Sequence, residues 1–309
     1  MLRILLLSLL ALPLFACADD GGQPVPEGPH HTYVVSEANV PVNNNQAREF
    51  GLDLNGDKAP DNQLGMVLGT LSNQGFDVQS AITQAISQGD IILLLDLQTS
   101  SYSSTSGAGL AVKLGDKATA MPTPCVDAND MTCRRHLGGT GRFTIGTGSP
   151  ENAAVSGKII GGTFNGGPGK ISLKIALGGP EGVQLDLIGA RAKATGMTDG
   201  GIDTVILAGA LPQDDLNTKV IPAIHSQLGP LVTRDCPGTT PPDCGCPAGS
   251  STGRTILTLF DTTPKNCIVT VDEIKNNTLI QSLLAPDVEI EGTQALSLGI
   301  KVKATVGTF

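Results

Sequence analysis

The stretch Ile171-Ser-Leu-Lys-Ile-Ala-Leu177, followed by Val183-Gln-Leu-Asp-Leu187, decides the fold. Apolar and polar residues alternate in both segments, and the alternation continues through Ala190-Arg-Ala-Lys-Ala-Thr195. A period of two places one face of a strand in a core and the other in water, which is typical of antiparallel sheets. We therefore predict an antiparallel sheet in the middle of the chain, with a turn at residues 178–182.

Helical and strand patterns surround this block. Further strands are predicted at residues 91–95, 202–210 and 300–306. Apolar residues at helical spacing predict helices at residues 64–71, 78–86, 214–234 and 270–284, the last opening with a capping box at Thr270 and Glu273. The glycine-rich segment at residues 166–170 lacks P-loop spacing and is predicted to be a turn. The class is α+β, with an antiparallel, sandwich-like or curved sheet and amphipathic helices packed on it.

The first sixteen residues have the composition of an export signal. One charge, Arg3, precedes an apolar run from Ile4 to Phe15. A transmembrane helix needs about 20 apolar residues, so this run of about a dozen fits a signal peptide instead. The segment Leu14-Phe-Ala-Cys17 resembles the bacterial lipobox, which implies that Cys17 is diacylated. Because Ala18 rather than Asp follows, the resemblance implies sorting to the outer membrane. The alternative is ordinary secretion with a chance cysteine.

The cysteine count supports lipidation independently. The chain has seven cysteines, and an odd number leaves one thiol unpaired in an exported protein. Cys125 and Cys133 are close enough in sequence for a local bridge, and Cys244 and Cys246 are predicted to reach Cys236 and Cys267. The alternative is zinc bound by the last four cysteines, although they lack the paired C-x-x-C spacing of structural sites. With Cys17 lipidated, the six disulfide cysteines are Cys125, Cys133, Cys236, Cys244, Cys246 and Cys267.

The chain divides into three predicted parts. Residues 1–16 are the signal peptide, residues 17–45 are the lipidated cysteine with a flexible tether rich in Gly and Pro, and residues 46–309 are a single α+β domain. His30 and His31 fall in the tether and are interpreted as solvated linker residues. The net charge of −9 argues against nucleic-acid binding, because an acidic chain repels phosphate.

One loop carries a metal-binding pattern. Asp53, Asn55, Asp57 and Asp61 occupy positions 1, 3, 5 and 9 of a short segment. Ca²⁺ takes about six to eight oxygen ligands of this kind. The segment resembles the calcium loops of FG-GAP and dockerin-like repeats, which implies a Ca²⁺ ion held by these four side chains.

The calcium loop departs from that pattern at two positions. Position 6 is Lys58 where Gly is usual, and position 12 is Leu64 where an EF-hand has Glu. The alternative is a plain turn in which Asp61 or Asn62 caps the next helix. A weaker pattern ends at Glu273, but proline stands at one of its ligand positions, so we predict that a disulfide at Cys267 holds this second loop.

The metalloprotease motif H-E-x-x-H does not occur in the sequence. His136 and His225 are isolated in the sequence, which disfavours an enzyme.

The chain resembles bacterial envelope lipoproteins with acidic, calcium-type loops. We predict a lipid-anchored, exported, non-enzymatic binding or structural protein of the envelope, stabilised by disulfides and calcium. The alternative is a carrier of lipid or another hydrophobic ligand, which would need an apolar tunnel between helix 214–234 and the sheet.

Overall fold

The computed structural model describes residues 23–72, 78–127, 129–130, 132–176, 182–262 and 264–309. Ten strands form one sheet, antiparallel except where the short β4 pairs with β10. The predicted antiparallel core with helices is therefore confirmed, while most of the predicted turn at 178–182 lies outside the described residues. The strands are β1 His30–Asn39, β2 Leu93–Gln98, β3 Thr105–Leu114, β4 Gly141–Arg142, β5 Ala154–Ile160, β6 Thr163–Ile175, β7 Val183–Thr198, β8 Gly201–Pro212, β9 Val288–Ile290 and β10 Thr293–Thr308.

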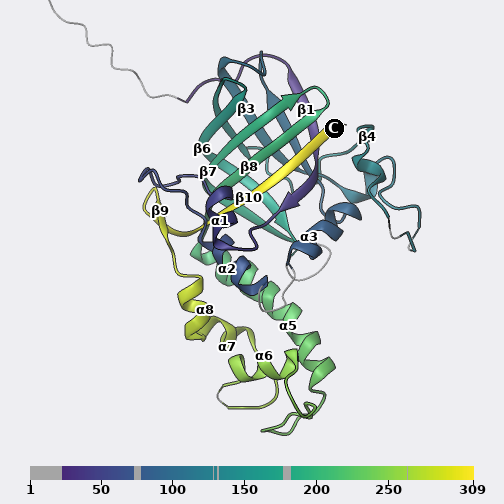
Figure 1. The fold of residues 1–309 in the computed structure, drawn as a ribbon, viewed down its shortest axis with the longest axis vertical. Coiled ribbons are helices and arrows are strands. Elements are labelled where there is room, and N and C mark those ends of the chain that lie inside the picture. Colours follow the sequence, from purple (N-terminus) through teal and green to yellow (C-terminus); the bar gives the residue numbers. More distant parts are fainter. Residues whose placement is uncertain (1–22, 73–77, 128, 131, 177–181, 263) are drawn as a thin grey trace, which may run out of the picture.

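The sheet closes on itself because its first strand pairs on both sides. β1 pairs antiparallel with β2 and also with β10. The other strands of the ring follow in chain order, β1-β2-β3-β5-β6-β7-β8-β10. Figure 1 shows this ring above a group of helices. Closure leaves no unpaired edge in the ring, so the sheet offers no template for pairing with another chain.

The interior of the closed sheet is filled by the apolar members of the alternating strands. Leu173 and Leu185 are 0% exposed, and Ile171 and Leu187 are 1% exposed. Ala190, Ala192 and Ala194 of β7 also face inward and join the same buried cluster. The strict alternation that predicted these strands therefore corresponds to an apolar interior and a polar exterior.

The predicted tether needs correction. β1 belongs to the sheet, so the fold begins before residue 46. Residues 23–29 lie along the outside of the sheet, where Glu27 N–H donates to the carbonyl of Gly107 at 3.4 Å and Thr99 N–H donates to Pro29 at 3.1 Å. A side chain at Gly107 or Gly109 would collide with Val25 or Pro26. Two glycines of β3 thus make room for the incoming chain.

The glycine-rich segment that we predicted as a turn is part of β6. The pairing of β6 with β7 is irregular between Gly166 and Gly169 and again between Gly169 and Ile171. Irregular pairing of this kind bends a strand without ending it. The turn prediction was wrong, because these glycines lie where β6 bends and the strand continues beyond them.

The predicted helices are present, with two changes. The helix predicted at 214–234 is a continuous run from Gln213 to Asp235 that contains one π-helical segment, Leu216–Val220. The helix predicted at 270–284 is two helices, because Asn277 ends the first and accepts N–H bonds from Leu279 and Ile280 of the second. The capping box is confirmed. The helices are α1 Asn44–Phe50, α2 Gln63–Ser72, α3 Val78–Ser87, α4 Gln213–Asp215, α5 Ile221–Asp235, α6 Thr252–Phe260, α7 Val271–Asn276 and α8 Thr278–Leu283.

No helix within the described ranges is long and apolar enough to cross a membrane.

A segment between β3 and β5 covers the outside of β1 and β2. Phe143 and Ala120 of this segment pack on Val34 of β1 and on Leu94 of β2. His136 lies beside Phe143, is 0% exposed, and has neither ring nitrogen hydrogen-bonded. Burial, with the nearby charge of Arg134, lowers the pKa of His136 to about 4.

We predict acid destabilisation that depends on His136. An unfolded histidine gains its proton near pH 6.5, whereas the folded one stays neutral to about pH 4, so stability is lost as pH falls through this window. The loss is about 3 kcal/mol at most. Urea unfolding from pH 7.5 to 4.5 should show this loss in the wild type and less of it in His136→Phe. His225→Gln is the control and should keep the loss; equal profiles for His136→Phe and wild type would contradict the assignment.

Candidate binding site on the helical lobe

Residues 213–287 form a lobe of helices, called here the helical lobe, at one end of the closed sheet (Figure 1). β8 begins at Gly201, where its pairing partner is Thr305 of β10, and ends at Pro212, where the lobe starts. At about 3.3 Å per residue, the 12 residues of β8 place the lobe roughly 40 Å along the strand from its start. The start of β8 lies beside β1, since Tyr33 donates its hydroxyl hydrogen to the carbonyl of Thr198.

Two disulfides hold the helical lobe, and both match the sequence prediction. Cys236 is bonded to Cys246, and Cys244 is bonded to Cys267. The third bridge, Cys125–Cys133, lies in the segment between β3 and β5. Because the last four cysteines are paired, the zinc alternative does not apply to the oxidised protein.

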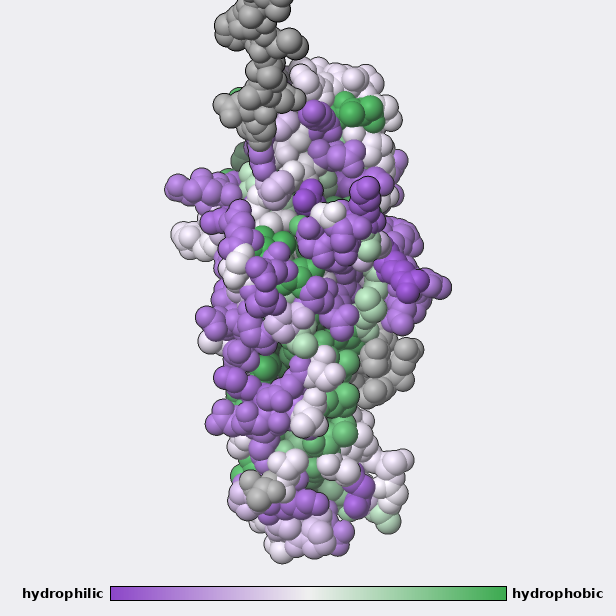
Figure 2. All heavy atoms as spheres, turned by 90° about the vertical axis from the view of Figure 1, so that its left-hand side faces the viewer, coloured by the Kyte–Doolittle hydropathy of each residue, from purple (hydrophilic) through white to green (hydrophobic). Residues whose placement is uncertain are grey.

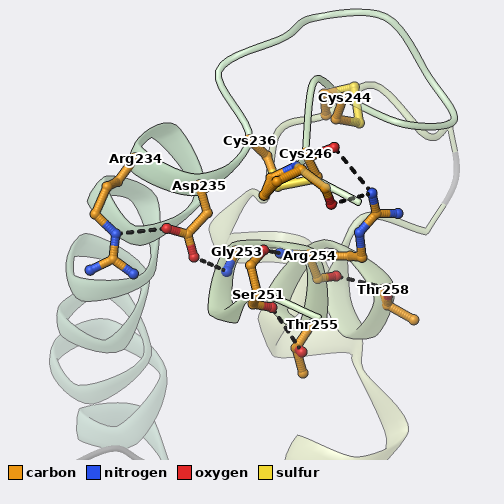
Figure 3. The surroundings of a disulfide bond; sticks show 12 residues. Arg234, Asp235, Cys236, Cys244, Cys246, Ser251, Gly253, Arg254, Thr255 and Thr258 are labelled. Atoms are coloured by element: carbon orange, nitrogen blue, oxygen red, sulfur yellow. Dashed lines mark hydrogen bonds and ion pairs between the residues drawn. A yellow bond between two sulfur atoms is a disulfide. The ribbon is translucent and has the colours of Figure 1, made fainter. Parts of the chain in front are cut away.

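Polar contacts fix the ends of α5 and α6 around the first of these disulfides (Figure 3). Asp235 accepts from the Arg234 guanidinium at 2.7 Å and from Gly253 N–H at 2.8 Å. These bonds, that of Arg234 first, lower the pKa of Asp235. Arg254 donates to the carbonyls of Cys246 and Pro247 at 3.2 and 3.1 Å. The loop between the helices is thus held by charge-assisted bonds as well as by sulfur.

Asp261 lies against the second disulfide. One of its oxygens and the sulfurs of Cys244 and Cys267 lie within 4.8 Å of one another, the one group of potential metal ligands of this density in the described part of the chain. Asp261 accepts N–H bonds from Asn266 and Cys267, each at 2.9 Å. Since both sulfurs are in the disulfide and the carboxylate is occupied, this group is a structural joint.

A cavity of about 580 Å³ opens on the helical lobe beside α7. This volume lies in the range of small-ligand sites, about 300–1,000 Å³. Leu259 and Leu279 are exposed close by, joined through Asn277, whose amide donates to the Leu259 carbonyl at 2.8 Å. The lower half of the face in Figure 2 shows hydrophobic residues exposed among polar ones. The cavity is lined by Thr262, Pro264, Asn266, Thr270, Asp272, Glu273, Asn276, Asn277 and Thr278.

Glu273 closes the wall of this cavity. Its carboxylate accepts from Thr270 N–H at 2.8 Å and from Thr262 N–H at 3.2 Å. The weak EF-hand-like pattern thus describes a real loop, but backbone donors occupy its last carboxylate. Every lining residue except Pro264 carries a hydroxyl, amide or carboxylate group, so the cavity presents both donors and acceptors.

The predicted calcium loop is a set of turns closed by its own backbone. Asp53 accepts N–H bonds from Gly56 and Lys58 at 2.6 and 3.0 Å, and Asp57 accepts one from Ala59 at 2.7 Å. Asn55 accepts one from Asp57 N–H at 3.0 Å. The bonds to Asn55 and Asp57, each from the residue two positions on, are those of Asx turns, as the plain-turn alternative predicted.

The carboxylates of the calcium loop form no dense ligand group. Asp53, Asp57 and Asp61 are absent from the dense ligand groups of the described residues. Asp61 accepts Leu54 N–H at 2.7 Å, and burial raises its pKa. Asn62 caps α2 by accepting Gly65 N–H at 3.0 Å. Backbone donors occupy several oxygens of the loop, and the calcium site stays a prediction.

A cluster that the sequence did not predict lies at the opposite end of the sheet. The hydroxyl of Tyr102 contacts His31 Nδ1 at 2.6 Å, Asp199 at 2.8 Å and the hydroxyl of Tyr33 at 3.2 Å. Burial raises the pKa of both tyrosines. His30 contacts Asp96 at 2.9 Å. The interpretation of the two histidines as linker residues was therefore wrong, because both belong to β1, although His30 is largely exposed.

This cluster joins three separate parts of the chain: β1, the turn after β2 and the turn after β7. Its members are far apart in sequence and follow no motif spacing, so nothing in the sequence marked them. The bonds close one end of the sheet and give the cluster a structural role.

No protein-family model, curated protein or solved structure matches this chain.

We predict that Asp53→Ala lowers the free energy of unfolding, because two N–H groups lose their acceptor. The expected loss is about 1–2 kcal/mol in urea unfolding with EDTA present. Thermal melting with EDTA and with Ca²⁺ then tests the calcium prediction. A calcium-dependent rise in Tm that Asp53→Ala plus Asp57→Ala abolishes would establish an ion; equal melting in both buffers would leave only the turn.

Proposed function

We propose that the chain is a lipid-anchored, non-enzymatic binding protein of the bacterial envelope, held at the outer membrane through Cys17, and that the cavity of the helical lobe is its binding site. The supporting observation is the position of the cavity. It lies on the disulfide-held lobe, while the described chain enters at the other end of the sheet, through β1. A lipid at Cys17 would therefore leave the cavity accessible.

The lining of the cavity favours a ligand rich in hydroxyl groups, such as an oligosaccharide. Amide and carboxylate side chains bind hydroxyl groups as donors and acceptors. Asn276 and Asp272 offer both kinds of group at the cavity wall. Exposed Leu259 and Leu279 provide apolar surface next to it.

The carrier alternative has less support. Leu216 and Val220, at the start of the long helix, are 0% and 1% exposed and belong to the same apolar cluster as the interior of the sheet. Side chains therefore fill the region in which a carrier would need a tunnel.

Membrane attachment has a direct test. Cys17→Ala should remove the acylated residue and release the protein from the membrane fraction, since one export signal without a lipid gives no stable anchor. Metabolic labelling with palmitate and membrane fractionation measure this. A variant that stays membrane-bound would refute the lipid anchor.

Ligand binding has a separate test. Asp272→Ala plus Asn276→Ala should weaken binding of N-acetylglucosamine oligomers by about 10- to 30-fold, the equivalent of two lost hydrogen bonds. Saturation-transfer NMR with the oligomers measures it. Lys275→Ala is the matched control, because Lys275 is exposed on the same helix but does not line the cavity. Equal binding by all three proteins would exclude the cavity, and no binding by the wild type would exclude this ligand class.

A further inference from the structure

The outer face of β5, β6 and β7 is basic, although the whole chain is acidic. These three strands carry five cations and a single acid, Asp186, which is bonded to Lys219 of the helical lobe. The net charge of the chain is −9. The five cations, called here the basic face, are Lys158, Lys170, Lys174, Arg191 and Lys193.

The basic face is open to solvent. Lys158, Lys170 and Lys193 are exposed, and alternation places them on the outside, opposite the buried Ile171 and Ala192. Lys158 and Lys193 flank Asn165 from the two neighbouring strands, so the two cations lie on the same face, about 10 Å apart at the backbone. None of the ion pairs between described residues involves the basic face. The described acidic side chains therefore do not neutralise its charge by ion pairing.

The helices leave most of this face uncovered; the π-helical segment Leu216–Val220 contacts β7, where Lys219 bonds to Asp186. α1 packs on β8 and β10, α2 packs on β10, and α3 packs on β1, which is the other side of the ring. Figure 2 shows mainly hydrophilic residues over the upper half of the face that it presents.

The incoming chain ends on the same face. Followed backwards from β1, the chain passes over β3 at Gly107 and Gly109 and reaches β6 at Gln23. There Gln23 donates its side-chain N–H to the carbonyl of Pro168. Five residues, 18–22, separate Gln23 from Cys17. Because an extended chain spans at most about 3.5 Å per residue, Cys17 can lie no more than about 21 Å from Gln23.

Two exposed apolar residues border the basic face. Val25, on the incoming segment, is 75% exposed, and Ile160, at the end of β5, is 68% exposed. Ile160 shares the outer face with Lys158 because the two residues are two positions apart. Basic residues with exposed apolar neighbours are the composition of surfaces that bind the headgroup region of anionic membranes.

We propose that the basic face lies against anionic lipid headgroups and fixes the orientation of the protein on its membrane. This inference rests on the proposed anchor at Cys17. A lipid at one residue holds a protein near the bilayer without orienting it. The short segment between Cys17 and Gln23 keeps this face close to the membrane surface. Each basic residue close to an anionic surface strengthens binding by about fivefold.

The test is lysine accessibility on the full mature lipoprotein. The protein is reconstituted in vesicles of phosphatidylcholine, or of phosphatidylcholine with phosphatidylglycerol, and labelled with an amine-reactive reagent. Lys158, Lys170 and Lys193 should label more slowly in the anionic vesicles than in the neutral ones, and high salt should remove the difference. Lys265 and Lys275, exposed on the helical lobe, are the matched controls and should label equally in both.

The outcomes separate the two proposals. Protein that does not float with either kind of vesicle would refute the anchor. Protein that floats, with all five lysines labelled equally in both lipids, would refute the orientation alone. Protection of Lys158 and Lys193 by added DNA but not by anionic vesicles would assign the face to nucleic acid and overturn the proposal. Lys158→Glu plus Lys193→Glu should abolish the lipid dependence, whereas Lys265→Glu plus Lys275→Glu should not.

Discussion

The antiparallel pairing of β1 with β10 joins the first strand of the fold to the last. Tyr33 lies opposite Val306, and Asn39 lies opposite Lys301. Without this pairing the other strands would form an open sheet, with two exposed edges and an apolar face in contact with water. Closure turns that face into an interior, and it also fixes where the chain enters, where the helical lobe leaves, and which outer surface the helices leave open.

The sequence predicted best those strands that have one wet face. Residues 171–175 and 183–195 alternate because their outer side chains meet water, and the structure confirms them. β1 gave no such signal, because Val34 is buried beneath Phe143 while Tyr33 and Val35 are buried inside. With both faces apolar, the period of two disappears. The Pro-rich segment before β1 then favoured the wrong interpretation, a flexible tether.

The sequence likewise predicted only some parts of the candidate site. The count and spacing of the cysteines predicted the three disulfides that the structure shows. The cavity was not predicted, since Thr262 and Asn276 come from ordinary polar segments that meet only after the Cys244–Cys267 bridge and the Asn277 cap fold the chain back. The acidic loop at Asp53 is the opposite case: its sequence pattern is recognisable, but its carboxylate oxygens accept hydrogen bonds from backbone N–H groups.

The direct passage from β8 into the helical lobe has a mechanical consequence. β1 and β8 run in the same direction on either side of β10, so a pull between the start of β1 and the end of β8 acts along the strands. Hydrogen bonds loaded lengthwise share the force, whereas those at a hairpin end break one after another. A force applied between the start of β1 and the helical lobe would thus load the sheet in its strongest direction.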